Sequence, residues 1–111
     1  MSLHLAWQGW STFLLTPASG PRVLVDPCTT TLAGFPAAAL QDLDADVLLL
    51  THGHHEHLRD VHRVLRALDV PVLAPPQVAD FLVRRRGVAP SRVSVLQPDV
   101  SLTLPGLTVI P

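Results

Sequence analysis

Apolar residues along the chain recur in short runs separated by turn residues, and this pattern predicts a series of strands. At the start, Leu3, Leu5 and Trp7 alternate with His4 and Ala6, which is the period of a strand. Clusters of proline, glycine, serine and aspartate separate this run from the later ones. The other predicted strands are residues 11–16, 22–25, 47–50, 72–74, 92–96, 100–104 and 107–110, the last two forming a hairpin across Pro105-Gly106.

Other stretches have helical rather than strand spacing. An apolar stripe with steps of three and four predicts a helix over residues 60–68, which must end near Asp69 because Val70 precedes a proline. The stripe consists of Leu58, Val61, Leu65 and Leu68. Further helices are predicted at residues 37–40 and at 77–86, the latter closed by Gly87. Strands with intervening helices predict an α/β fold.

The largest cluster of potential metal-binding side chains in the sequence directly follows the apolar run at residues 47–50. Four of the six histidines lie within residues 52–57, together with the single glutamate, Glu56. The apolar run indicates a strand buried on both faces. The cluster therefore lies where a strand ends and a helix begins, and ligand sites of α/β proteins collect at that end of the strands.

These residue types favour a divalent metal. Neutral imidazole and carboxylate are usual ligands of zinc. His52 and His54 are separated only by Gly53 and can turn to one side, whereas Glu56 and His57 are adjacent and can point to a second position. The spacing suggests two neighbouring metal positions, and the alternative is a surface turn that happens to be rich in histidine.

The pattern H-x-H-x-E-H resembles the H-x-H-x-D-H motif of the metallo-β-lactamase superfamily, which also follows a buried strand and opens a helix. The resemblance implies that His52 and His54 bind one metal and that Glu56 and His57 bind the other. It implies two ions in the complete site, zinc first, with iron or manganese as alternatives. Glu56 stands where the family usually has aspartate, and it is also the candidate catalytic residue. His55, at the variable position of the motif, is assigned either to the solvent-facing surface or to the cleft lining.

The N-terminal part resembles the lactonase-like branch of this family, related to ascorbate-6-phosphate lactonase. In that branch a Gly-His-Ser turn follows the first strand, and a later strand ends in Asp-Pro. Here Trp10 replaces the histidine of the turn, and the strand ends in Asp26-Pro27. Asp26 is either a carboxylate that orients a ligand histidine from behind or an ordinary turn residue before proline.

Length, charge and composition limit the number of domains, the kind of partner and the cellular location that the sequence allows. A chain of 111 residues suits one domain, and a net charge of −1 argues against a nucleic-acid partner. No apolar run reaches the roughly 18 residues of a membrane helix, and no signal peptide is recognisable. Cys28 is the single cysteine, so no internal disulfide is expected. Together these features predict a cytoplasmic protein.

In the family, a second half of the domain completes the site with a third histidine, a bridging aspartate and a final histidine. Neither His4 nor His62 matches these ligands. The resemblance therefore implies that residues 1–111 are the N-terminal half of an αββα sandwich, with a mixed sheet, helices on one face, and the C-terminal half absent.

Three functions remain open for such a half. It is a hydrolase of small molecules that activates a metal-bound water, a metal-binding module without turnover, or an interaction domain. The strands carry more apolar residues than one covered face can hold, so we expect one sheet face to be bare. That face would pair in a homodimer or with a complementary C-terminal half.

Overall fold

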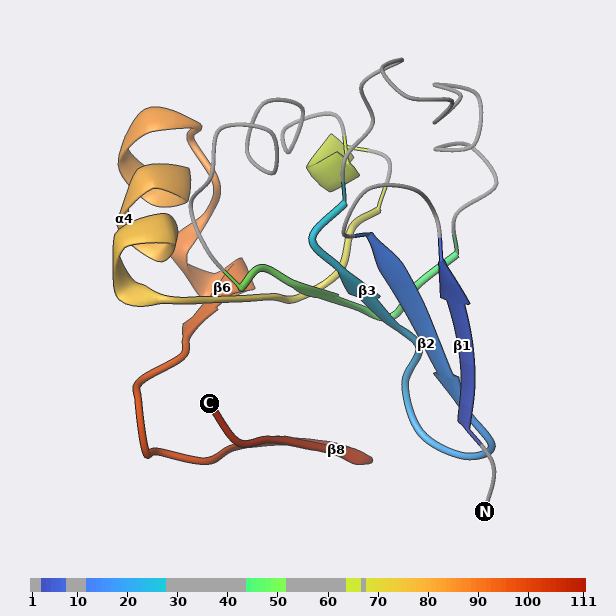
Figure 1. Ribbon diagram of the computed structural model, residues 1–111. Helices are drawn as coiled ribbons and strands as arrows, with labels where there is room; N and C mark the ends of the chain where they lie inside the picture. Colours follow the sequence, from blue (N-terminus) through green and yellow to red (C-terminus); the bar gives the residue numbers. More distant parts are fainter. Residues whose placement is uncertain (1–2, 8–11, 28–43, 52–63, 67) are drawn as a thin grey trace.

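The main element is a mixed sheet whose strands lie side by side in the order of the chain. The computed structural model describes residues 3–7, 12–27, 44–51, 64–66 and 68–111. In this part the sheet has six strands, of which β1 to β3 are antiparallel and β3 to β6 are parallel (Figure 1). They are β1 (Leu3–Trp7), β2 (Phe13–Pro17), β3 (Val23–Val25), β4 (Val47–Leu49), β5 (Val72–Ala74) and β6 (Val93–Val95). The predicted α/β class is confirmed.

Helices cover one face of this sheet. Helix α4 (Pro76–Arg85) begins with proline at its first position, where the missing N–H costs nothing, and ends before Gly87, whose φ of 69° closes it. Residues 64–66 are helical, and a 3-10 turn, Pro90–Arg92, precedes β6. The predictions for residues 60–63 and 37–40 lie outside the described residues. Of the helices described, none has the length and apolar character needed to cross a membrane.

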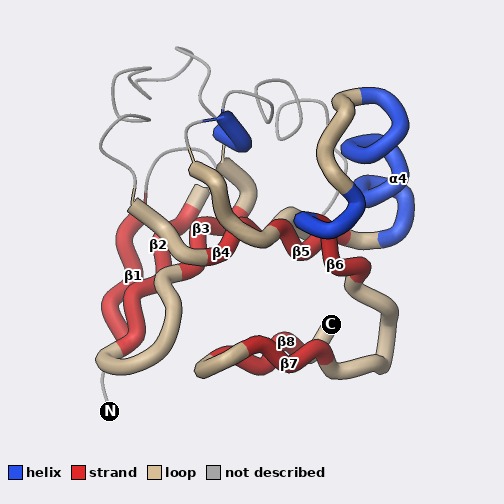
Figure 2. The backbone as a smooth tube through the Cα atoms, turned by 180° about the vertical axis from the view of Figure 1, so that it is seen from behind, coloured by secondary structure: helices blue, strands red, loops and turns tan. Residues whose placement is uncertain are grey.

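A hairpin covers part of the opposite face. Strands β7 (Leu102–Leu104) and β8 (Leu107–Val109) are antiparallel and lie below the sheet, away from α4 (Figure 2). Its turn contacts the turn between β2 and β3, because a Cβ added to Gly20 would lie 2.8 Å from the carbonyl oxygen of Gly106. The hairpin predicted across Pro105-Gly106 is therefore confirmed, and it is docked rather than free.

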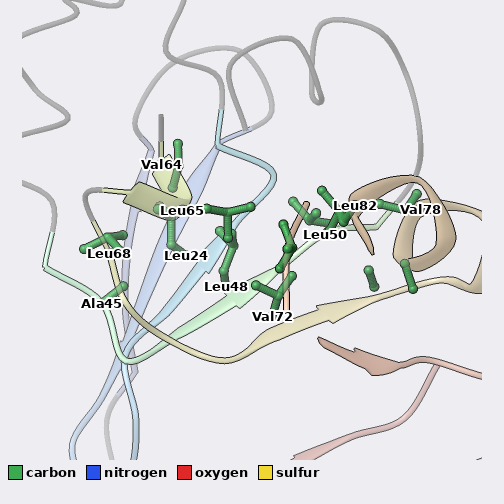
Figure 3. Packing of buried hydrophobic residues seen from close by; sticks show 13 residues of the cluster. Leu24, Ala45, Leu48, Leu50, Val64, Leu65, Leu68, Val72, Val78 and Leu82 are labelled. Atoms are coloured by element: carbon green, nitrogen blue, oxygen red, sulfur yellow. The ribbon is translucent and has the colours of Figure 1, made fainter. Parts of the chain in front are cut away.

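Strand β4 lies between two apolar cores. Leu48 and Leu50 are fully buried on the helix side, where they pack with Val64, Leu65 and residues of α4 (Figure 3). Val47 and Leu49 belong to the core on the hairpin side. The strand that leads to the histidine cluster is thus buried on both faces, as its apolar run predicts.

The prediction that one sheet face is bare is correct for only part of that face. The hairpin covers the β3–β6 part of that face, and Leu24 belongs to the helix-side core instead. The β1 end remains open: Leu3, Leu5 and Trp7 share one side of the strand and are 63%, 56% and 66% exposed. The sequence pattern did not predict this cover, because it does not show where the hairpin of β7 and β8 docks.

Two arginines fix the connections around β4. Arg92 donates hydrogen bonds to the carbonyl oxygens of Leu65, Leu68 and Val70, so it holds the end of the helical segment that follows the histidine cluster. At the amino end of β4, Arg22 pairs with Asp46 and with Asp44. Hydrogen bonds from the Arg22 side chain and backbone N–H lower the pKa of the Asp46 carboxyl.

Candidate metal site

Four parallel strands end at the same edge of the sheet, and each places a different residue there. Asp26 follows β3, Thr51 follows β4, Pro75 follows β5 and Leu96 follows β6. Thr51 is bonded directly to His52, the first residue of the histidine cluster. The residue before the cluster therefore lies at the carboxyl end of the strands, the position at which α/β proteins bind ligands.

Asp26 holds the last residue before the cluster through its carboxylate. The backbone N–H of Thr51 donates to Oδ1 of Asp26 at 2.8 Å, and the Thr51 hydroxyl donates to Oδ2. Asp26 is 4% exposed, so its carboxyl oxygens are buried and need such donors. Both oxygens of the Asp26 carboxylate thus accept hydrogen bonds from Thr51, which fixes the backbone and the side chain of Thr51.

The backbone around Asp26 is itself fixed by three further features. Its φ is 45°, in the left-handed region that aspartate tolerates better than most residues. Its N–H donates to the carbonyl oxygen of Leu49 at 2.9 Å, which extends the pairing of β3 with β4. The buried hydroxyl of Thr12 donates to its carbonyl oxygen at 2.7 Å. Asp26 therefore connects the residue before β2, the end of β3 and the end of β4 through its hydrogen bonds.

Thr12 and Thr51 are absent from the residues that the sequence singles out. Thr51 carries one available signal, since a hydroxyl residue lies between an apolar strand and a ligand motif. Thr12 carries none, because its partner is the backbone of a residue 14 positions away.

The predicted ligands His52, His54, Glu56 and His57 lie outside the described residues, as do His55 and Trp10. Among residues 3–7, 12–27, 44–51, 64–66 and 68–111, no three His, Cys, Asp or Glu side chains form a group that could hold a metal. The convergence of the four ligands stays a prediction. Their chemistry, three imidazoles and a carboxylate, suits zinc.

A cavity of about 480 Å³ opens at the same edge of the sheet. It lies between the carboxyl ends of β4, β5 and β6 and the end of β8. Of the residues that the structure describes, its lining includes Leu49, Thr51, residues 75–77, Leu96, Pro98 and residues 109–111. Thr51 thus belongs both to the Asp26 contact and to the wall of this cavity.

A mixed sheet with helices on one face and a carboxylate-anchored strand end define the described part of the chain as an α/β fold. The family model of the metallo-beta-lactamase superfamily matches residues 5–108. The chain belongs to this superfamily.

Relatives and solved structures agree with this assignment. The chain is 29% identical over 86 residues to a UPF0173 metal-dependent hydrolase of Koribacter versatilis and 33% identical over 88 residues to one of Staphylococcus carnosus. Each alignment covers 78% of this chain and 36% of the relative, so the chain spans about a third of their length.

Two solved structures share the fold. The metallo hydrolase Igni18 of Ignicoccus hospitalis superposes with a TM-score of 0.74 at 18% identity, over 93% of this chain and 43% of its own. The metallo-beta-lactamase SMB-1 superposes with a TM-score of 0.62 at 24% identity, over 94% of this chain and 48% of its own. At these identities the structures support the fold and not a substrate.

Proposed function

We propose that this chain is the metal-binding half of a zinc-dependent hydrolase of small molecules. His52 and His54 hold the first ion, and Glu56 and His57 hold the second. The observation that carries the proposal is the contact between Asp26 and Thr51. A buried carboxylate anchors the residue before His52 with both of its oxygens, which is more than an ordinary turn requires.

In this proposal some residues position the metal-binding segment and others bind the metal. Thr12 and the Leu49 carbonyl fix Asp26, and Asp26 fixes Thr51, the residue that precedes His52 in the chain. Glu56 acts as a metal ligand and as the catalytic carboxylate. When bound, zinc supplies an activated water and polarises the scissile group. Iron or manganese are the alternative metals, and a cytoplasmic location is part of this proposal.

Turnover requires more than these residues. We propose that the rest of the site comes from a complementary half or from a second copy of this chain, which would also cover the open β1 end of the sheet. The exposed side chains of Leu3, Leu5 and Trp7 support this, because three apolar groups in one stripe form a patch that soluble monomers usually avoid.

Zinc titration of the metal-free chain tests the proposal. We expect zinc binding that is reduced in stoichiometry or affinity by His52→Ala and by His57→Ala, each of which removes a ligand of one ion. His4→Ala is the matched control, since His4 is an exposed histidine on β1. If all three variants bind zinc like the parent, the cluster is a histidine-rich turn without a metal role.

Hydrolysis separates an enzyme from a remnant that only binds metal. Zinc-loaded protein is assayed on panels of esters, lactones and phosphodiesters. Zinc binding without turnover of any panel member, at concentrations that drive self-association, would assign the chain to the metal-binding or interaction modules.

A further inference from the structure

Strand β1 is one of the two outer strands of the six-stranded sheet, and it lies at the end of the sheet away from α4 (Figure 1). All five of its residues pair with β2 along one edge of the strand. No strand of the described part of the chain lies beside its other edge. An edge of this kind presents a row of backbone N–H and C=O groups that pair readily with a further strand.

The sequence of β1 has none of the features that usually keep an outer strand from pairing. Such features are a very short strand, a charged side chain or a proline. The residues of β1 are Leu-His-Leu-Ala-Trp, without proline, lysine, arginine or carboxylate. Strand β6, the other outer strand, has three residues, directly follows Arg92 and contacts α4. The comparison indicates that β1 is the edge on which this sheet accepts a partner.

One face of β1 is also apolar and exposed. Leu5 pairs with Leu15, which packs against the core on the hairpin side, so the stripe of Leu3, Leu5 and Trp7 lies on that face. The hairpin does not cover this stripe, because each of the three residues is exposed over more than half of its surface. A strand added at the edge of β1 would extend this face and place its own side chains next to the stripe.

The stripe is symmetric about Leu5, since apolar residues lie two positions before it and two positions after it. In an antiparallel pair of two β1 strands with a two-fold axis at Leu5, Leu3 of each copy lies opposite Trp7 of the other. Leu5 lies opposite Leu5, and His4 lies opposite Ala6, so all five residues are matched. No pair brings like charges together, and three of the five pairs join apolar side chains on one face. A strand that matches itself in this way fits a second copy, because a two-fold contact uses the same patch on both chains.

We propose that two copies of this chain join their β1 strands antiparallel about a two-fold axis at Leu5, so that their sheets form one continuous sheet. This inference rests on the pairing part of the proposed function, and it selects a second copy rather than a complementary half as the partner at this edge. It is independent of zinc, because no residue of β1 is a predicted metal ligand.

Cysteine cross-linking without metal tests the register of the two strands. In an antiparallel pair the Cα atoms of opposite residues are about 4.5–5.5 Å apart, within the range of about 4.4–6.8 Å that a disulfide spans. The two Leu5 residues are opposite each other in the proposed pair. The two Leu3 residues are instead separated by four positions along the strand, roughly 14 Å, and so are the two Trp7 residues.

All variants carry Cys28→Ser, so that the introduced thiol is the only one in the chain. With oxidised glutathione as the oxidant, we expect Leu5→Cys to form a disulfide dimer with itself. Leu3→Cys and Trp7→Cys should each stay unlinked alone and form a dimer when the two are mixed. Val100→Cys, at a position as exposed as Leu5, is the control and should stay unlinked in every mixture.

Amide hydrogen exchange of the unsubstituted chain gives a second measurement that needs no variant. The N–H groups of alternate residues of β1 face its outer edge, so their exchange should slow as the protein concentration rises. Exchange in β2, which already pairs with a strand on each side, should change less. Exchange in β1 that is the same at all concentrations would overturn the proposal.

The cross-linking results also separate this contact from the metal site. Failure of Leu5→Cys to link would overturn the proposal and leave the edge of β1 to a chain of different sequence. Equal linking of all three β1 variants with themselves would overturn it as well, because it would indicate unspecific contact between apolar stripes. A chain that links at residue 5 but binds no zinc keeps the contact and removes the metal-binding function, whereas the reverse result removes the contact alone.

Discussion

Asp26 binds Thr51 through both carboxylate oxygens, and it does so from the end of a neighbouring parallel strand. The two residues are 25 positions apart in the chain. Their contact joins the turn after β3 to the residue before the histidine motif, so the position of Thr51 depends on a side chain far from it in sequence.

Replacing Asp26 by asparagine tests this dependence. Asparagine tolerates the same backbone conformation but offers one acceptor oxygen in place of two, so one of the Thr51 donors loses its partner. We expect a loss of about 1–3 kcal/mol in the free energy of unfolding, measured with urea, together with weaker zinc retention.

Asp99→Asn is the matched control, because Asp99 also has a positive φ, 64°, but is exposed in a turn. It should change neither quantity by a measurable amount. Equal zinc retention in the two variants would show that Asp26 is a structural turn residue only.

Glu56 and His55 are adjacent in the motif but have different predicted roles. If Glu56 binds the second ion, Glu56→Gln removes a charged ligand, whereas His55→Ala removes a residue that is not a predicted ligand. Metal content after dialysis should therefore be lower in Glu56→Gln. Equal content in the two variants would mean that Glu56 is merely a carboxylate near a helix start.

Arg92 should contribute to stability through the helix end that it holds. Arg92→Gln removes a charged donor from the carbonyl oxygens of Leu68 and Val70, and we expect a loss of about 1–3 kcal/mol in denaturant unfolding. Arg84→Gln is the control. The ion pair of Arg84 with Asp80 is exposed on α4, and its removal should cost less than about 0.5 kcal/mol.

The pair of Arg22 and Asp46 predicts a small dependence of stability on acid. Because folding lowers the pKa of Asp46, the pair contributes above the unfolded aspartate value of about 3.9. The contribution is lost as the pH falls through the lower folded value. Urea midpoints between pH 2 and pH 7 should fall less steeply in Asp46→Asn than in the parent, whereas a parallel pair of curves would contradict the assignment.

The open end of the sheet predicts self-association or pairing. Leu5→Lys places a charge in the apolar stripe of β1 and should shift sedimentation at micromolar concentration toward the monomer. Val100→Lys is the control, since Val100 is also 56% exposed but lies before the hairpin. A parent chain that sediments as a monomer, with or without zinc, would contradict pairing of two copies.

Local pattern predicted the elements well because each strand carries its own signal. The run at residues 72–74 and the alternation at residues 3–7 coincide with β5 and β1, and the apolar run before the motif predicted a strand buried on both faces. The polar network was not predictable in the same way. Thr12 bonds to the backbone carbonyl oxygen of Asp26, and Thr51 bonds to the Asp26 carboxylate from 25 positions away. A sequence does not show which distant acceptor a hydroxyl will reach.

The strand order of the sheet also has a consequence for synthesis on the ribosome. Each of strands β2 to β6 pairs with the strand that left the ribosome just before it, so the sheet can grow by addition at one edge. The hairpin is different, since its turn at Gly106 must return to Gly20, a contact that closes most of the chain into a loop. This contact cannot form before the hairpin has been synthesised, so until then the hairpin does not cover the face that carries Val23 and Val47.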